Sequence, residues 1–330
     1  MWHYISRRFV YMIFTVWIIS LISFVMIQLP PGDYVTSMIS QMLTSSGGTN
    51  LPPEYEAQLR EQYGLNQPVY VQYYKWIRNI VVHGDFGYSF VYKEDAKKMI
   101  LERLPMTFAI SGFSVLFIWV VALPIGIFSA VKQYSIGDYL FTFIGFIGLA
   151  VPNFLLALIL MFISYKYFDG AMIGLFSPKY ADAPWSLGKV IDLFKHMGIP
   201  VIILGTGGTA GLIRTMRANL LDELNKPYVD TARAKGLPEM RLLWKYPVRH
   251  ALNPFISTVG WVLPTLVGGE VIVSKVLNLP TSGPVIFNAL QDQDMYLAAG
   301  FLLVLSTLTV LGTFISDLLL AVLDPRIRLQ

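Results

Sequence analysis

The 330-residue sequence has no cysteine, and only 14% of its residues are charged. The lack of cysteine excludes disulfides, thiol catalysis and thiolate metal sites. Four histidines are present, and they are scattered without metal-ligand spacing: His3, His83, His196 and His250. No serine, histidine and aspartate share a predicted membrane depth. A metalloenzyme or an intramembrane protease is therefore not predicted.

Hydrophobic residues, by contrast, make up 55% of the chain, which is more than an ordinary soluble domain of this size contains. Six uncharged stretches approach or exceed the roughly 20 residues that a helix needs to cross about 30 Å of hydrocarbon. They are Phe9–Leu29, Pro105–Val131, Tyr139–Tyr165, Met197–Ile213, Ala251–Gly269 and Met295–Ser316. Runs this continuous lack the alternation of a barrel strand. We predict an all-α membrane protein with six transmembrane helices.

The distribution of Lys and Arg predicts the orientation of these helices. With the N-terminus inside, the cytoplasmic segments are 1–8, 132–138, 214–250 and 324–330, and they hold 13 of the 25 basic residues. Both termini are then cytoplasmic. The net charge of +4 is explained by this topology, so nucleic-acid binding is not predicted. The first apolar run is longer than a signal-peptide core and is expected to remain as a membrane anchor.

The order of apolar and polar stretches predicts three parts. Residues 1–29 form the first transmembrane helix, residues 30–104 form an external subdomain, and residues 105–330 form a five-helix core. Within the external subdomain, short helices are expected at Pro53–Tyr63 and, from its amphipathic spacing, at Tyr70–Val82. A cap that only shields the helices is the alternative role for this subdomain.

A basic cytoplasmic loop at 219–250 carries the strongest local signals. Asp230–Lys235 favours a helix, and Gly236 ends it because glycine takes a left-handed C-terminal conformation at least cost. Pro238 starts a second helix with Glu239 in its first turn, and Pro247 kinks or ends it. Binding of anionic lipid by a basic juxtamembrane loop is the alternative interpretation.

Two further features fall in the apolar runs. Gly205–Gly211 is glycine-rich but lacks the Gly-Lys-Ser/Thr ending of a phosphate loop, so ATP chemistry is not expected on this chain. Gly207 and Gly211, four residues apart, instead predict a close helix–helix contact. Glu270 is a rare ionisable residue at membrane depth and is expected to face protein or water. It lines a substrate path, pairs within the bundle, or lies near the outer interface.

The string Asp230-Thr-Ala-Arg-Ala-Lys-Gly-Leu237 has the spacing of the EAA loop of ABC importer permeases, which it resembles. Ala232–Leu237 is similar to the form found in the dipeptide/oligopeptide branch. Other fragments match that branch in order: Tyr63–Pro68, Gln72-Tyr73, Trp76, Gly84–Ser89, Arg103–Thr107 and Asp324–Arg328. Tyr246-Pro247, His250, Lys275 and Thr281–Gly283 depart from its pattern. The resemblance covers almost the whole chain.

This resemblance implies a type I ABC importer permease fold and a non-catalytic subunit for peptide uptake in a prokaryotic cytoplasmic membrane. It further implies a second homologous permease, two ATP-binding subunits that hold ATP and Mg, and an external substrate-binding protein. The residues implied in ATPase coupling are Asp230, Thr231, Ala232, Arg233, Ala234, Lys235, Gly236, Leu237 and Glu239. Alternatives are oligosaccharide or nickel-chelate uptake by the same machinery, or an ion-coupled secondary transporter.

Overall fold

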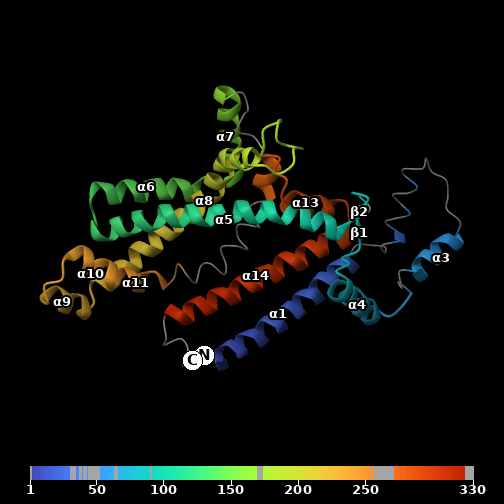
Figure 1. The fold of residues 1–330 in the computed structure, drawn as a ribbon, viewed down its shortest axis with the longest axis horizontal. Helices are drawn as coiled ribbons and strands as arrows, with labels where there is room; N and C mark the ends of the chain where they lie inside the picture. The colour runs from blue at the N-terminus through green and yellow to red at the C-terminus, as the bar shows by residue number, and fades with distance from the viewer. Residues whose placement is uncertain are drawn as a thin grey trace. The chain divides into compact units, whose positions relative to one another are not determined.

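The computed structural model describes residues 2–29, 35–36, 39, 43, 53–62, 66–89, 91–168, 174–253, 255 and 271–323. These residues are mostly helical, as Figure 1 shows. They divide into two compact units. The smaller unit comprises Ser6–Pro105 and Pro284–Val310, and the larger comprises Met1–Ile5, Met106–Gly283 and Leu311–Gln330.

The smaller unit packs three helices around aromatic side chains. They are α1 (Trp2–Gln28), α4 (Val69–Arg78) and the first part of α14 (Met295–Leu323). Phe24 and Trp76 are buried against Ala299 and Leu303, and the hydroxyls of Ser20 and Tyr73 are hydrogen-bonded at 2.7 Å. The two short helices expected in this region are confirmed: α3 spans Pro53–Gln62, and α4 continues into a π-helical turn, η1 (Asn79–His83).

A short hairpin in the smaller unit gives a physical reason for the Gly84–Ser89 motif. Strands β1 (Tyr88–Ser89) and β2 (Glu94–Asp95) pair antiparallel. Gly87 has φ +93°, and a Cβ there would lie 2.9 Å from the Tyr296 ring, so both conformation and space require glycine. The buried Ser89 hydroxyl donates to Asp294, which immediately precedes α14.

The larger unit contains two helices much longer than a bilayer requires. α5 (Ala96–Val131, shared with the smaller unit) has 36 residues and α8 (Leu187–Leu224) has 38. At about 1.5 Å per residue they are roughly 54 and 57 Å long, against about 30 Å of hydrocarbon. α5 therefore begins nine residues before the predicted start at Pro105, and Ser186 caps α8 well outside the predicted span.

The predicted single helix at Tyr139–Tyr165 is wrong. This run forms α6 (Ile136–Ala150) and α7 (Asn153–Phe168), which are bent by 99° relative to each other. Pro152 lacks the N–H that a continuous helix would use, and it disfavours helical geometry in the preceding residue. Val151 accordingly has φ −84° and ψ 118°.

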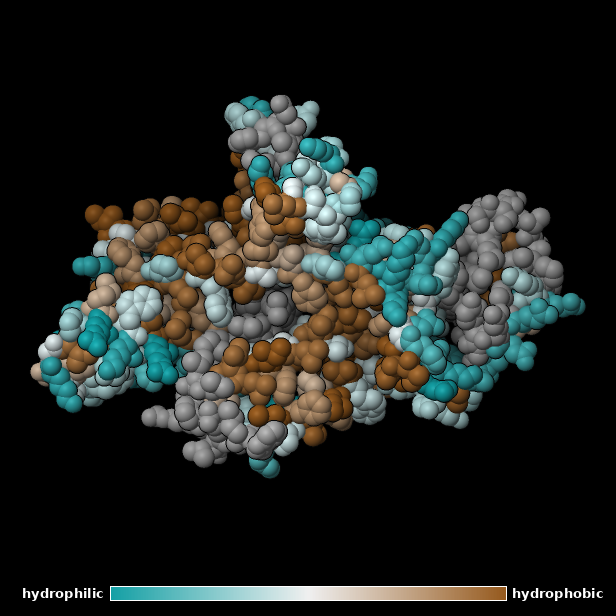
Figure 2. Space-filling model, viewed as in Figure 1, coloured by the Kyte–Doolittle hydropathy of each residue, from teal (hydrophilic) through white to brown (hydrophobic). Residues whose placement is uncertain are grey.

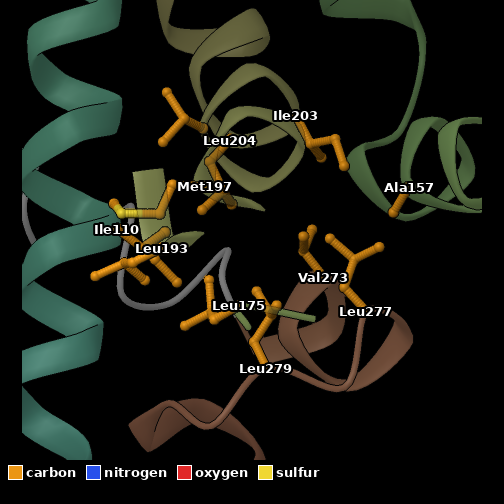
Figure 3. Packing of buried hydrophobic residues seen from close by; sticks show 11 residues of the cluster. Ile110, Ala157, Leu175, Leu193, Met197, Ile203, Leu204, Val273, Leu277 and Leu279 are labelled. Carbon is orange, nitrogen blue, oxygen red and sulfur yellow. The ribbon is translucent and has the colours of Figure 1, made fainter. Parts of the chain in front are cut away.

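The main core of the larger unit lies where α5, α7, α8 and the segment after residue 271 meet. Figure 3 shows Ile110 from α5, four residues from α8, Ala157 from α7 and Val273, Leu277 and Leu279 pointing toward one another. The four α8 residues are Leu193, Met197, Ile203 and Leu204. These side chains come from segments up to 169 residues apart in the chain (Ile110 to Leu279), so this core brings together distant parts of the sequence.

The predicted close contact at Gly207 and Gly211 is also wrong within this chain. A Cβ on Gly211 would meet nothing within 4 Å, and one on Gly207 would reach only a single side-chain atom at 4.0 Å. Gly205 and Gly208 make the close approach instead. A Cβ on Gly205 would overlap the Phe117 ring, and one on Gly208 would lie 2.7 Å from Ile118, so these glycines set the spacing between α8 and α5.

Among the described residues, three helices are long and apolar enough to cross a membrane: His3–Gln28, Ala96–Val131 and Met295–Leu319. The bent pair α6 and α7 makes up to four, if it is one broken span. Most of the predicted span Ala251–Gly269 lies outside the described residues. The count of six remains a prediction. In Figure 2, hydrophobic residues cover much of the surface over α6, as a membrane-facing helix requires.

Candidate coupling site

Two short helices, α9 (Pro227–Ala234) and α10 (Glu239–Lys245), follow α8 and enclose the EAA-like string. The turn between them is a Schellman motif: the N–H of Gly236 donates to Arg233 O at 2.9 Å, and the N–H of Leu237 donates to Ala232 O at 3.3 Å. Gly236 has φ +74°. The four-residue spacing from alanine to glycine is thus the spacing of this helix C-terminus, as the sequence predicted.

The α9–α10 pair has a small hydrophobic core of its own. Val229, Ala232 and Leu242 are buried together, and Leu237 packs against them from the turn. Ala232 is the residue whose carbonyl accepts from Leu237, and its methyl side chain leaves room for α10 to approach α9. A larger residue at this position would separate the two helices, which explains why the motif places alanine there.

An exposed ion-pair network joins the two helices. Arg233 Nε donates to Glu239 Oε1 at 2.7 Å, and its Nη1 lies 3.4 Å from Asp230 Oδ1. The hydrogen bond from Arg233 lowers the pKa of Glu239 and, reciprocally, raises the pKa of Arg233. Arg233, predicted as a contact to a partner, therefore also bridges α9 to α10 across the turn.

Most of the predicted coupling residues are on the surface. Asp230, Thr231, Arg233, Ala234, Lys235, Gly236 and Glu239 are exposed, Leu237 is half-buried and Ala232 is buried. On α10, Met240 and Trp244 are 69% and 58% exposed. Figure 2 shows hydrophilic residues gathered over α9 and α10, beside the hydrophobic surface over α6. The turn thus presents a compact, mixed polar and apolar surface.

Aromatic and ionic contacts attach this surface to the end of α8. Glu223 on α8 pairs with Lys226 and accepts a hydrogen bond from the Tyr228 hydroxyl. The Tyr228 ring packs against Tyr246 and His250, with centroids at 6.4 and 5.9 Å. Burial and the Glu223 carboxylate raise the pKa of Tyr228, so its hydroxyl stays protonated. Tyr246 and His250, which depart from the family pattern, thus share one cluster at the base of α9.

α11 (Pro247–Ala251) completes the attachment. Pro247 ends α10, as predicted, by starting this new helix after Tyr246. Val248, Ala251 and Phe255 are buried against α8 and α5 in a second hydrophobic cluster. This cluster includes Met216 and Leu220 of α8. The α9–α10 pair is therefore held to α8 on both sides, through Glu223 before it and α11 after it.

A buried ion pair between α6 and α8 was not among the features predicted from the sequence. Arg217 donates from Nε and Nη2 to the two oxygens of Asp138, at 3.0 and 2.9 Å, and the Asp138 side chain is only 3% exposed. The backbone N–H of Tyr134 also donates to Asp138. A signal was available, because Asp138 and Arg217 lie in segments both predicted to be cytoplasmic.

Only some of the remaining candidate residues are among those that the structure describes. Glu270, the predicted substrate-path residue, lies outside the described residues. Thr107, from the Arg103–Thr107 motif, is buried and donates its hydroxyl to Ser282, whose N–H donates back to Thr107 Oγ1, both at 2.9 Å. Ser282 belongs to one of the departing segments, so this contact ties two motif positions together. Among the described residues, no cluster of three or more His, Asp or Glu could hold a metal ion.

Comparisons with known sequences agree with these features. Residues 122–329 match the family described as "Binding-protein-dependent transport system inner membrane component", and residues 1–111 match its N-terminal component. The oligopeptide transport system permease protein AppB of Bacillus subtilis is 36% identical, covering 98% of this chain and 99% of that protein. The dipeptide transport system permease protein DppB of Escherichia coli K12 is 30% identical, covering 99% of each.

A solved structure supports the fold. The MetNI methionine ABC transporter, in inward-facing conformations, aligns with a TM-score of 0.52 over 68% of this chain and 96% of that chain. The sequence identity there is 18%, so the likeness concerns the fold alone. The matches along nearly the full sequence show that the chain belongs to the family of binding-protein-dependent transport system inner membrane components.

Proposed function

We propose that this chain is a permease subunit of an ATP-driven importer for peptides, and that the α9–α10 pair couples it to ATPase subunits. The identity with oligopeptide and dipeptide permeases over nearly the whole chain carries the peptide assignment. In this proposal a second homologous permease completes the translocation path. Two ATP-binding subunits hold ATP and Mg, because the chain itself has no phosphate loop.

The coupling role rests on the exposure and attachment of α9 and α10. Arg233, Ala234 and Lys235 are exposed at the end of α9, and Met240 and Trp244 are exposed on α10, so a groove on a partner could receive charged and apolar groups together. Large aromatic anchors of this kind dominate many protein interfaces. Because α9–α10 has its own core and is joined to α8 through Glu223 and α11, displacement of the pair would move α8 with it.

The external face has a complementary role in this proposal. Segments 30–104 and 275–297 form the docking surface for a substrate-binding protein, which releases peptide into the cavity between the two permeases. Residues 30–104 act as the external subdomain, and residues 105–330 as the five-helix core with its coupling loop at 219–250. Glu270 is proposed to line the path, where its carboxylate would meet a peptide amino group.

Charge reversal at an exposed motif position tests the coupling role. The full chain carrying Lys235→Glu is expressed with its neighbouring transport subunits, affinity-purified in mild detergent and analysed by mass spectrometry for ATPases that remain bound. We expect the ATPases to be lost or strongly reduced, since Lys235 is exposed at the turn and its substitution leaves the α9–α10 core intact.

Lys132→Glu is the matched control, because Lys132 is also exposed and lies on the face predicted to be cytoplasmic, outside the coupling loop. ATPases retained equally by both variants, with peptide uptake unchanged, would contradict the coupling assignment. A wild-type chain that purifies without any ATPase or second permease in several mild detergents would contradict the importer assignment itself.

A further inference from the structure

A cleft of about 270 Å³ runs between α6 and α8, beside the Asp138–Arg217 pair. One end is polar, with Arg214 and the rings of Tyr134 and Tyr139 at its edge. The other end is apolar, where Phe146 and Leu149 of α6 lie beside α8. The cleft therefore changes from cationic to hydrophobic along its length. None of the coupling residues lines it.

The charge at the polar end is positive. Arg217 is held by Asp138 through two of its nitrogens, so those two charges offset each other. Asp138 is the one acidic group among the described residues that line the cleft. Arg214 is exposed, and within the described part of the chain no ion pair or hydrogen bond is formed by its guanidinium. Arg214 thus supplies an available cation at the mouth of an apolar cleft.

The dimensions match one leaflet of a membrane. Tyr139 and Leu149 are ten residues apart on α6, which corresponds to about 15 Å at 1.5 Å per residue. Half of a hydrocarbon core of about 30 Å has this thickness. Phe143, Ile144 and Ile147 are exposed along the same helix, and Figure 2 shows hydrophobic residues over much of α6, so this helix has a surface suited to lipid. Arg214 lies in the C-terminal half of α8, the half that leads to α9.

We propose that the α6–α8 cleft binds an anionic phospholipid, with the phosphate on Arg214 and an acyl chain along Phe146 and Leu149. A guanidinium can donate two parallel hydrogen bonds to a phosphate. Tyr134 and Tyr139 have the amphipathic rings that are enriched at the membrane–water interface. The lipid would occupy the leaflet on the side of the coupling helices, wedged between α6 and the helix that carries them. This site is separate from the coupling function proposed above.

Native mass spectrometry of the full chain, extracted with the subunits it retains, tests the site. The protein is offered phosphatidylglycerol or phosphatidylcholine with identical acyl chains. We expect phosphatidylglycerol to be retained preferentially, and Arg214→Gln to weaken its retention about fivefold, the effect of one basic residue at a charged surface. Arg214→Lys should keep most of the binding. Lys132→Gln removes a charge on the same face outside the cleft and should leave retention unchanged.

Two further arms separate the sources of the phosphate group. Thr142→Trp fills the middle of the cleft without touching Arg214, and it should reduce lipid retention. Added inorganic phosphate should not displace the lipid, because the acyl chain contributes to binding. Equal retention of both lipids, equal effects of Arg214→Gln and Lys132→Gln, or an unaffected Thr142→Trp would overturn the proposal. Full displacement by inorganic phosphate would overturn it in favour of a soluble anion.

Discussion

Two ion pairs in the larger unit differ in their burial and in the helices that they join. Asp138 and Arg217 join α6 to α8, with a nearly inaccessible carboxylate that receives two guanidinium nitrogens. Arg233 and Glu239 join α9 to α10 on an exposed surface. A buried pair must be fully hydrogen-bonded to offset the loss of hydration, whereas an exposed pair costs little to form and little to break.

The buried pair fixes two helices against each other, whereas the exposed pair belongs to a surface whose contacts a partner can replace. The buried pair holds α6 against α8, and its Asp138 carboxylate is almost inaccessible to a partner. The exposed pair orients the Gly236 turn while it leaves its charges accessible, so a docking subunit can replace Arg233–Glu239 contacts with its own. The buried pair thus fixes the contact between α6 and α8, whereas the exposed pair leaves the proposed coupling surface free to adapt to a partner.

Breaking the buried pair should have the largest effect on stability. Arg217→Met leaves the Asp138 carboxylate buried without its cation, and we expect the free energy of unfolding to fall by about 3–5 kcal/mol. Denaturant unfolding of the chain in mild detergent measures this loss. The double variant Asp138→Asn, Arg217→Met should recover much of it, because the orphan charge is gone. A single variant as stable as wild type would show that water reaches Asp138.

The coupling turn was predictable because its geometry is decided locally. Gly236 and Pro247 act through φ and a missing N–H, and both appear in the structure where the sequence places them. The break at Pro152 shows the limit of such reasoning. Pro200 lies inside continuous α8, whereas the chain bends after Val151. Whether a proline breaks a helix depends on the packing around it, which a sequence does not display.

Other features required tertiary information. Asp138 and Arg217 are 79 residues apart, and charge and predicted topology alone did not single out that pairing. The glycines of α8 make the same point: Gly207 and Gly211 have a favourable spacing, but Gly205 and Gly208 face α5. Composition shows that a helix can be approached closely, whereas its rotation about its own axis depends on its neighbours.

Straining the Gly236 turn between Arg233 and Glu239 should have an intermediate effect on stability. Gly236 has φ +74°, and a Cβ there meets nothing within 4 Å, so Gly236→Ala introduces backbone strain without a clash. We expect a loss of about 1 kcal/mol in the stability of the chain, measured by denaturant unfolding. Gly236→Asn should lose less, since asparagine tolerates the left-handed region better. Equal losses for both would point to a cause other than backbone conformation.

Titrating the exposed pair should have the smallest effect, and its sign follows from the pKa of Glu239. The hydrogen bond from Arg233 lowers this pKa below its ordinary value of 4.5. The ionised carboxylate therefore stabilises the folded state above pH 4.5, and this contribution is lost as the pH falls through the lowered pKa.

Melting temperatures of wild type and Glu239→Gln in detergent measure this contribution. Their difference should be present at neutral pH, smaller than the shift caused by Gly236→Ala, and should vanish once the pH falls below the lowered pKa of Glu239. Asp222→Asn removes an exposed carboxylate outside α9 and α10, and it should not reproduce that pH dependence. A difference that persists in acid would mean that Glu239 stabilises the turn by packing. In that case the charges of Arg233 and Glu239 would make no measurable contribution to stability. The exposed pair would then differ from the buried pair in stabilising its helices through packing.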